Sequence, residues 1–505
     1  MKNKQLTINF IANIVAFIIN IALTFILTPY IVSKVGSEAY GFVPLANNMI
    51  NYVAIFTAAL NSMAGRYISI EINSNNNEKA NIYFNSVLRA NTIIAIILIV
   101  PSILATLYIN RIFNIPLDML SDVQLTFIFV YINIIIALAG NVFSVSTFCK
   151  NRLELTAYRN IEGNIIKLVI TLLLFLLFNP KIYFITLTSI AVTLYTIFTN
   201  IHYTKKLLPE IKISLKDYSS SAIRILIKSG LWNSVNQLSV VLLTNLDLMI
   251  ANILIGSSLA GQYSLAKTIP SFITSFIGSV VSVFVPQFTI LYAMNKQTEL
   301  LKNINFSIKV VGLIVVIPIS FLIIFGDTFF SLWLPGEDTQ LLYLLSNLTL
   351  IPMIVTGSIN PIFNVYTVTD KLKIPALVLL ITGIVNTIIT IVVLNITTLD
   401  IIAIPLVSLV IGLIRNLIFT PLYAAYCLKI KWWSLYLSIS KGVICSIITM
   451  AISLVLKFSI TVNTWLVFFI AAILCGGAAL IINFFIMFDK NERYEALGIF
   501  RKKHK

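Results

Sequence analysis

Ionised side chains interrupt stretches of this chain that are otherwise apolar enough to lie in a membrane. Asp247 is the one acid well inside such a stretch, whereas the basic residues in comparable places are Arg89, Lys167, Lys267, Arg415 and Lys441. A charge at that depth costs roughly 2.5–3.5 kcal/mol on insertion scales and is a functional candidate by default. The excess of cations predicts a positive cavity, which suits an anionic substrate and would repel a cationic one.

Arginine and lysine side chains are the expected contacts to an anionic substrate. Arg415 is the leading candidate, because it lies near the middle of its apolar stretch and can grip a phosphate with two parallel hydrogen bonds. The other basic candidates are Arg66, Arg89, Lys167, Lys267 and Lys309. Arg89, Lys309 and also Lys441 lie a turn or two inside the cytoplasmic boundary and Lys167 two to three turns, so their charged groups could instead extend to the lipid headgroups.

Uncharged polar residues and one potential ion pair complete the candidates. Asn61 and Asn236 could hydrogen-bond sugar hydroxyls, with pairing between helices as the alternative. Asp247 and Lys267 each lie about ten residues from the turn at Ser257, so a helical rise of about 1.5 Å per residue puts them at similar depths. We favour a structural ion pair narrowly. The alternative is that Asp247 binds a coupling proton or sodium ion and thereby releases Lys267 for the substrate.

The composition indicates that these residues are positioned by helices in a lipid bilayer. The chain is 58% hydrophobic and 11% charged, where a soluble protein carries about a quarter charged residues. The apolar runs do not alternate as the strands of a membrane barrel do. We therefore predict an all-α integral membrane protein with fourteen spans, at roughly 6–30, 39–65, 82–109, 122–148, 156–178, 180–203, 229–255, 260–287, 304–326, 341–368, 373–395, 398–427, 437–459 and 463–488.

The distribution of basic residues predicts the orientation in the membrane. With both termini in the cytoplasm, most lysines and arginines fall on the cytoplasmic side, including the tail residues Arg501, Lys502 and Lys503. Those that fall outside are Lys34, Arg111, Lys181 and Lys457. The net charge of +16 is therefore read as attraction to anionic inner-leaflet lipid, and nucleic acid is not an expected partner.

An internal repeat divides the chain. Residues Gly36–Ala46 and Gly256–Ala266 align without a gap at an offset of 220, which also pairs Asn85 with Asn305 and Arg89 with Lys309. Each copy holds six spans, an even number, so the copies are expected to be parallel and related by a pseudo-twofold axis along the membrane normal. The predicted divisions are a six-helix lobe (1–205), a basic amphipathic linker on the inner membrane surface (206–228), a second six-helix lobe (229–430), and two extra helices with a basic tail (431–505).

Residue patterns for covalent chemistry are not found in the sequence. The four cysteines have no metal or redox spacing, and no glycine-rich phosphate loop of the Walker type occurs. We therefore expect no metal, no cofactor and no enzymatic reaction.

Two segments carry a family resemblance. The start, ANIVAFIINIALTFILTPYIVSKVGSEAYGFVPLANNMINYVAIF (Ala12–Phe56), resembles the first hairpin of bacterial polysaccharide-biosynthesis flippases. These are O-antigen-type translocases of the multidrug/oligosaccharidyl-lipid/polysaccharide exporter superfamily. The stretch NVYTVTDKLKIPALVLLITGIVNTIITIVVL (Asn364–Leu394) resembles their junction between the tenth and eleventh spans. The resemblance extends to the whole chain through the fourteen spans.

The resemblance implies two lobes around a central cavity in the bacterial cytoplasmic membrane. The implied cargo is an oligosaccharide on undecaprenyl diphosphate, moved from the inner to the outer leaflet by alternating access, with membrane lipids and polysaccharide polymerase machinery as further partners. The first span, Ile8–Tyr30, lacks the arginines of peptidoglycan-precursor flippases and the acid of drug exporters. The alternatives are a cation-coupled drug or metabolite antiporter of the same fold and, ranked last, a membrane polysaccharide polymerase or glycosyltransferase.

Overall fold

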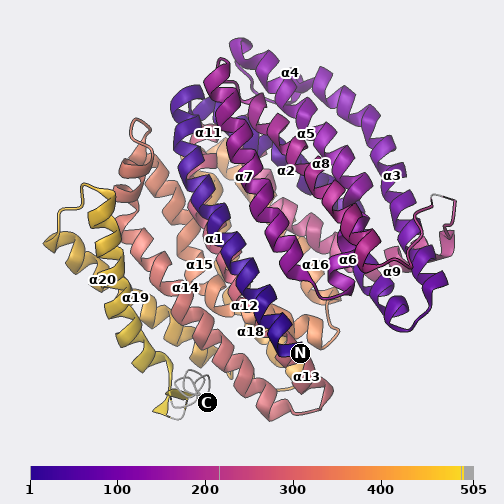
Figure 1. The fold of residues 1–505 in the computed structure, drawn as a ribbon. Coiled ribbons are helices and arrows are strands. Elements are labelled where there is room, and N and C mark those ends of the chain that lie inside the picture. Colours follow the sequence, from indigo (N-terminus) through magenta and orange to yellow (C-terminus); the bar gives the residue numbers. More distant parts are fainter. Residues whose placement is uncertain (1, 215, 491, 494–505) are drawn as a thin grey trace. The chain divides into compact units, whose positions relative to one another are not determined.

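The computed structural model describes residues 2–214, 216–490 and 492–493, and these form helices joined by short turns (Figure 1). Within these described residues, fourteen helical segments are long and apolar enough to cross a membrane, which confirms the all-α, fourteen-span prediction. Helices are favoured in a membrane because lipid offers no hydrogen-bond partner, and a helix pairs its backbone N–H and C=O groups within its own segment. The basic tail expected at the cytoplasmic side, Arg501 to Lys503, lies outside the described residues.

Several spans consist of more than one helix. The elements of the first six spans are α1 (Lys2–Val35), α2 (Ser37–Asn73), α3 (Asn77–Leu107), the short α4 (Ile109–Ile112), η1 (Leu117–Met119), α5 (Leu120–Gly140), η2 (Asn141–Ser144), α6 (Val145–Cys149), α7 (Leu153–Leu177) and α8 (Tyr183–Leu207). Spans seven and eight comprise α9 (Ser220–Val240), η3 (Val241–Asn245), α10 (Leu246–Leu254), α11 (Ser257–Ala266), α12 (Thr268–Val281) and α13 (Val285–Ala293). The remaining elements are α14 (Gln297–Trp333), α15 (Thr339–Val368), α16 (Lys373–Ile396), η4 (Asp400–Ile402), α17 (Ala403–Ile414), η5 (Arg415–Phe419), α18 (Thr420–Leu428), α19 (Tyr436–Ser459) and α20 (Trp465–Met487).

Turns at equivalent places of the two repeats share an unusual backbone. Gly36 precedes α2 with φ 83°, and Gly256 precedes α11 with φ 142°; both lie in the region that glycine tolerates best. Asn75, between α2 and α3, and Asn295, between α13 and α14, are again 220 residues apart and have φ 56° and 55°. Asparagine is one of the few other residues that adopt this conformation readily. The repeat seen in the sequence is therefore repeated in local backbone geometry.

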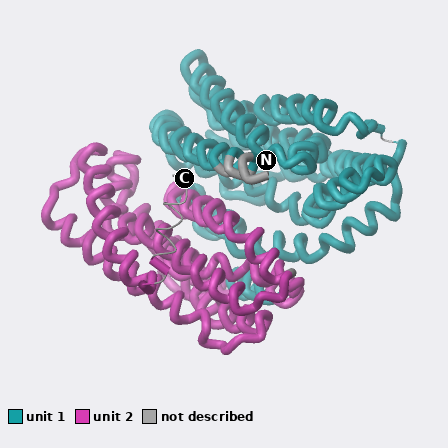
Figure 2. Tube along the Cα trace, turned by 60° about the horizontal axis from the view of Figure 1, so that its bottom comes forward, with its two compact units in different colours: residues 1–264, 376–387 teal, residues 265–375, 388–505 magenta. Residues whose placement is uncertain are grey.

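Packing divides the chain into two compact units, which are coloured separately in Figure 2. Unit 1 comprises residues 1–264 and 376–387, and unit 2 comprises 265–375 and 388–505. Span seven belongs to unit 1 because α9 lies directly on α2: a Cβ on Gly230 would meet the carbonyl oxygen of Ala59 at 2.0 Å. The backbone N–H of Ala59 also donates to the hydroxyl of Ser234 at 3.0 Å. The boundaries of the two packing units thus differ from those of the two six-helix lobes expected from the sequence repeat. The division into lobes stays a prediction.

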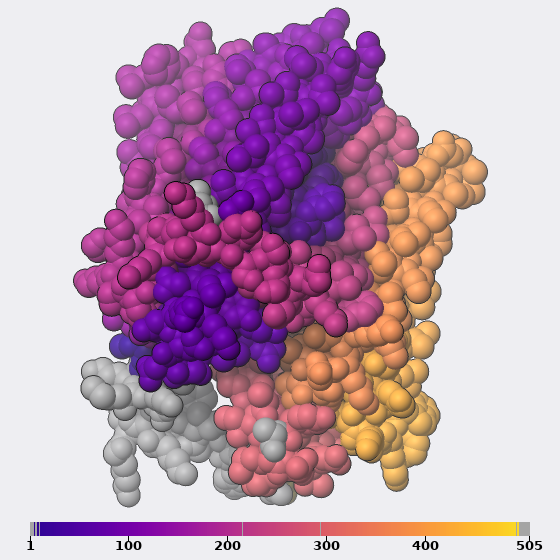
Figure 3. Space-filling view, turned by 90° about the vertical axis from the view of Figure 1, so that its right-hand side faces the viewer, coloured from indigo at the N-terminus to yellow at the C-terminus, as the bar shows by residue number. Residues whose placement is uncertain are grey.

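The segment expected to form one amphipathic linker, 206–228, has three parts. Residue 207 ends α8, residues 208–214 and 216–219 have no regular helix, and α9 already begins at Ser220. The irregular part is fastened to α3: the Asn85 amide donates to the carbonyl of Lys212 at 2.9 Å and accepts from the N–H of Ser214 at 3.0 Å. Leu208 is fully buried beside α3. Figure 3 views this side, with the magenta connecting segment next to the indigo and purple of α2 and α3.

Two spans contain a turn of π-helix. In unit 1 it is η3, between α9 and α10, and in unit 2 it is η5, between α17 and α18. A π-turn inserts one residue into a helix and frees backbone groups, and such turns occur often at functional sites. Asn245 ends η3 and Arg415 begins η5, so both interruptions fall on polar residues, and one of them is the leading cation of the sequence analysis.

Candidate functional site

Arg415 lies at mid-depth of its span in unit 2. The span runs from Asp400 to Leu428, which places Arg415 about 20 Å along the helix from either end. Its Nε donates to Oδ1 of the neighbouring Asn416 at 3.1 Å, and the Asn416 amide donates to Oγ1 of Thr356 at 2.7 Å. Within the described ranges no carboxylate pairs with this guanidinium. The remaining N–H groups of Arg415 are thus available to an anion.

Lys167 occupies a similar depth in unit 1. It is half-buried on α7, roughly 15 Å along the helix from the nearer end of that helix. One turn away on either side are Gly163 and Thr171, and both positions face α8. Over the part of the chain that the structure covers, neither a hydrogen bond nor an ion pair engages the Lys167 ammonium. A cation held in a span without a counter-charge is costly, so a role with an anionic ligand is the natural hypothesis.

The repeat-equivalent cations are instead engaged by the protein. The Arg89 guanidinium lies over the ring of Tyr218, in the segment before α9, at 3.6 Å from the ring centroid. Lys309 is buried in α14 and donates to both carboxylate oxygens of Glu492 at 2.7 and 2.8 Å. Each therefore contacts a segment that follows its repeat copy. These contacts supply a structural role beside the substrate role expected from the sequence.

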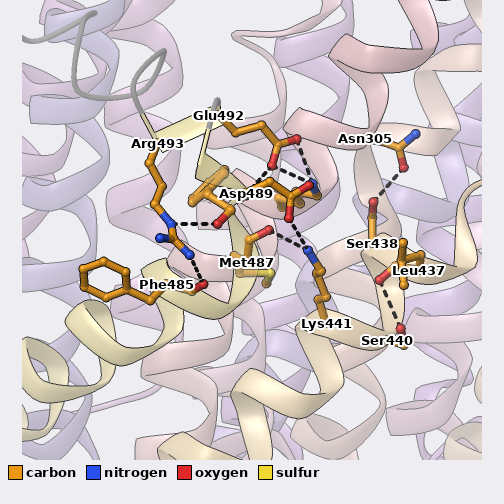
Figure 4. A network of polar contacts seen from close by, with 12 residues as sticks. Asn305, Leu437, Ser438, Ser440, Lys441, Phe485, Met487, Asp489, Glu492 and Arg493 are labelled. Atoms are coloured by element: carbon orange, nitrogen blue, oxygen red, sulfur yellow. Dashed lines mark hydrogen bonds and ion pairs between the residues drawn. The ribbon is translucent and has the colours of Figure 1, made fainter.

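Lys309 belongs, through Glu492 and Asp489, to a larger cluster at the end of α20. Figure 4 shows both acids and Lys441. Lys441 of α19 approaches Asp489 at 3.3 Å and the carbonyl of Met487 at 3.4 Å. The hydrogen bond from Lys441 holds the pKa of the Asp489 carboxyl below its usual value. Asn305, the equivalent of Asn85, accepts from the hydroxyl of Ser438 at 2.7 Å. Asn85 thus fastens the irregular segment before α9, whereas its equivalent Asn305 bonds the first turn of α19 itself.

The two asparagine candidates and Arg66 lie in unit 1. Asn61 accepts a hydrogen bond from the amide of Asn91 at 3.0 Å, an instance of the pairing between helices that was the alternative to sugar binding. Asn236 is exposed on α9. Arg66 is exposed near the end of α2, beside a hollow described below. The structure does not gather these residues around one described cavity.

Asp247 and Lys267 fall in different units, so their pairing stays a prediction. Asp247 is 5% exposed and accepts from the hydroxyl of Tyr263 at 3.3 Å, within unit 1. Lys267 stands between α11 and α12, where its carbonyl accepts from the backbone N–H of Ser271 at 3.0 Å.

Sequence reasoning missed the partners of the π-turn in span seven. The backbone carbonyl of Asn245 accepts from the amide of Asn48 at 3.2 Å and from the hydroxyl of Tyr52 at 3.3 Å. In return, the Asn245 amide donates to Oδ1 of Asn48 at 2.9 Å. The polar asparagines were visible in the sequence, but the π-turn that exposes the carbonyl had no signal. The result is a polar junction between α2 and span seven.

At the opposite ends of the helices, ion pairs fasten spans within each unit. Lys181 donates to Asp122 at 2.7 Å, and this bond raises the pKa of the Lys181 ammonium. Lys457 donates to both oxygens of Asp327 at 2.7 Å. Among the described residues, no three His, Cys, Asp or Glu side chains gather in a way that could hold a metal ion. The charged groups at these ends are thus occupied structurally.

Comparison with known proteins gives consistent matches. A family model described as "Polysaccharide biosynthesis protein" matches residues 6–292, which is more than half of the chain. The uncharacterized membrane protein EpsK of Bacillus subtilis (strain 168) is 29% identical over 501 residues, covering 99% of this chain and 98% of that protein.

Solved structures share the fold. Lipid II flippase MurJ in an inward closed conformation superposes with a TM-score of 0.70 at 15% identity, covering 96% of this chain and 98% of that chain. An inward-facing multidrug resistance MATE family transporter of the MOP superfamily gives 0.60 at 14% identity, with 82% and 94% covered.

Proposed function

Because the chain belongs to the polysaccharide biosynthesis protein family, we propose that it is a flippase for a lipid-linked oligosaccharide. The cargo would be an oligosaccharide on undecaprenyl diphosphate, moved from the inner to the outer leaflet of the bacterial cytoplasmic membrane for a surface polysaccharide such as O-antigen or capsule. No bond is made or broken in this process. The fold shared with a lipid II flippase supports a lipid-linked cargo.

The observation that carries the proposal is the pair of uncompensated cations in the spans. Arg415 and Lys167 lie deep in helices of the two units, and no acidic partner holds either one within the described residues. An anion that passes through the membrane domain would supply the negative charge that these two cations lack. The diphosphate is the obligatory anion of such a substrate, whatever its sugars are, so it is the group we assign to Arg415.

Transport would follow alternating access, in which the two repeat lobes rock about a central site while the prenyl chain stays in lipid. Lys267, Arg89 and Lys309 would serve as secondary contacts, and the last two would first have to leave Tyr218 and Glu492. Contact with polysaccharide polymerase machinery is part of the same proposal.

The experiment that tests this is substitution of Arg415 with measurement of surface glycan and of lipid-linked precursor. Arg415→Ala should abolish surface delivery and accumulate precursor at unchanged protein level. Arg415→Lys should retain part of the activity, because an ammonium cannot make the bidentate contact. The matched control is Lys457→Met, which removes a cation that already pairs with Asp327 and should leave delivery in place. Full delivery by Arg415→Ala would refute the assignment.

A cation-coupled antiporter remains the second candidate, and buried Asp247 is the observation that favours it. A proton or sodium ion at this carboxylate could drive either kind of transport. The double variant Asp247→Asn/Lys267→Met separates two roles of Asp247. If Asp247 and Lys267 form a structural ion pair, the double variant should recover export. If Asp247 is the coupling site, the double variant should be well expressed but inactive. We favour the structural pair.

A further inference from the structure

A hollow of about 510 Å³ opens at the end of α2, apart from the cations of the mid-membrane region. Its lining comes from the last two turns of α2, from the residue after that helix and from α6. The lining residues are Arg66, Ser69, Ile70, Asn73, Ser74 and Phe148. All of them belong to unit 1.

The depth of the hollow matches the phosphate level of a leaflet. Arg66 lies 29 residues after Ser37, the first residue of α2, which is about 44 Å along a straight helix. A bilayer has a hydrocarbon core of about 30 Å and spans about 40–45 Å with its headgroups. If Ser37 stands at one surface, Arg66 therefore stands among the headgroups of the other. The distribution of lysine and arginine makes this the inner leaflet.

The chemistry of the lining suits a phosphate. Arg66 is exposed, and in the described part of the chain its guanidinium makes neither a hydrogen bond nor an ion pair. The Ser74 hydroxyl and the Asn73 amide are further donors, although Asn73 already donates to the Ser69 carbonyl at 2.7 Å and hydroxyl at 3.3 Å. No carboxylate lines the hollow to compete with an anion.

Apolar walls complete the site. Phe148 and Ile70 are 54% and 49% exposed at the edge of the hollow. A cation beside exposed apolar side chains fits a lipid, in which a phosphate and hydrocarbon chains belong to the same molecule. A soluble phosphate would use only the polar half of this lining.

We propose that the hollow binds the phosphate of a membrane lipid at the inner surface. Two lipids offer this group: a prenyl diphosphate, the anchor of the cargo, and an anionic phospholipid. With the first, the hollow would be where the cargo is captured before it reaches Arg415, and this branch rests on the proposed function. With the second, the hollow would hold a structural lipid. Arg66 makes the bidentate contact in either case.

Binding to the purified full-length protein tests the site independently of transport. Native mass spectrometry can titrate the protein with farnesyl diphosphate or with dioleoylphosphatidylglycerol, and with dioleoylphosphatidylcholine as the zwitterionic reference. Arg66→Gln should weaken binding of at least one anionic probe by about tenfold, the loss of a charge-assisted contact. Arg66→Lys should lie between. The matched control is Arg224→Gln, which removes an exposed arginine near the start of α9 in the same unit.

The outcomes distinguish the sources. Loss of both anionic probes supports a shared phosphate site; loss of farnesyl diphosphate alone supports cargo capture; loss of phosphatidylglycerol alone supports a structural lipid. Equal affinities of Arg66→Gln and Arg224→Gln for both probes overturn the site. If Arg66→Gln does not fold, Asn73→Ala/Ser74→Ala keeps the cation and removes the neutral donors, and unchanged binding in that variant also overturns it. The binding result does not depend on the transport assay: whatever Arg415→Ala does to export, the lipid affinities of Arg66→Gln and Arg224→Gln still decide whether the hollow binds a phosphate.

Discussion

Removing the carboxylate that holds Lys309 should destabilise the protein far more than removing its exposed neighbour. The side chains of Lys309 and Glu492 are 8% and 14% exposed, and two hydrogen bonds of 2.7 and 2.8 Å join them. Glu492→Gln keeps the shape but leaves the buried ammonium with only the more distant and exposed carboxylate of Asp489, at 3.9 Å. Breaking a buried pair in this way costs about 3–5 kcal/mol.

The matched perturbation in the same cluster is Asp489→Asn. The Asp489 side chain is 72% exposed and lies 3.3 Å from Lys441 and 3.9 Å from Lys309. Exposed pairs contribute about 1 kcal/mol or less. The two variants should therefore differ by at least about 2 kcal/mol, or roughly 30-fold in the folding equilibrium.

The assay is thermal unfolding of the purified full-length protein in detergent, followed by the loss of the monodisperse peak in size-exclusion chromatography. We expect Glu492→Gln to unfold at a clearly lower temperature than Asp489→Asn, which should stay close to the parent. Lys309→Met/Glu492→Gln removes the orphaned charge and should recover most of the loss. Equal effects of the two single variants, or a double variant as unstable as Glu492→Gln, would refute a buried and stabilising pair.

Three further outcomes follow. The hydrogen bond from Lys441 lowers the pKa of Asp489, so the ionised carboxylate stabilises the fold above the unfolded carboxyl pKa of about 3.9. This stabilisation is lost as the pH falls through the folded pKa. The difference in unfolding free energy between the parent and Asp489→Asn should therefore be constant from pH 7 to about 5 and disappear in more acidic unfolding titrations. Gly41→Ala should reduce the amount of folded protein in membranes, because its Cβ would lie 2.5 Å from the Cα of the facing glycine, whereas Gly278→Ala has nothing within 4 Å and should be neutral. A cysteine at Ser74 should be shielded from an impermeant thiol reagent in intact cells and one at Gln340 labelled; labelling at Ser74 from outside would reverse the orientation.

The fold could be predicted from the sequence because hydropathy and backbone pairing leave few choices in lipid. Span boundaries were less accurate where a helix extends beyond its apolar stretch. Helix α9 begins at Ser220 rather than 229, since Ala222 and Leu226 of its first turns are buried against the protein. The amphipathic pattern of residues 206–228 could not reveal that Asn85 fastens the backbone of this segment to α3.

The candidate site divides along the same line. The depth of Arg415 could be read from its distance to the ends of its apolar stretch, and the structure places it at mid-span. The pairing of Lys309 with Glu492 joins residues 183 apart in sequence, and no local pattern connects them. Hydropathy reports how deep a residue lies, whereas the partner of a charge is decided by tertiary packing. Depth was therefore predictable and pairing was not.

The close approach of Gly41 to Gly261 is the contact expected if the two repeats come from two copies of one shorter chain. These are the same position in the two repeats, and a Cβ on Gly41 would lie 2.5 Å from the Cα of Gly261. In a homodimer with twofold symmetry, a residue next to the axis meets its own copy. A single-copy ancestor that dimerised here would have packed this glycine against itself, and gene fusion would have made the contact intramolecular. In the present chain each position still excludes a side chain, because a Cβ on Gly261 would lie 2.5 Å from the carbonyl oxygen of Ser37.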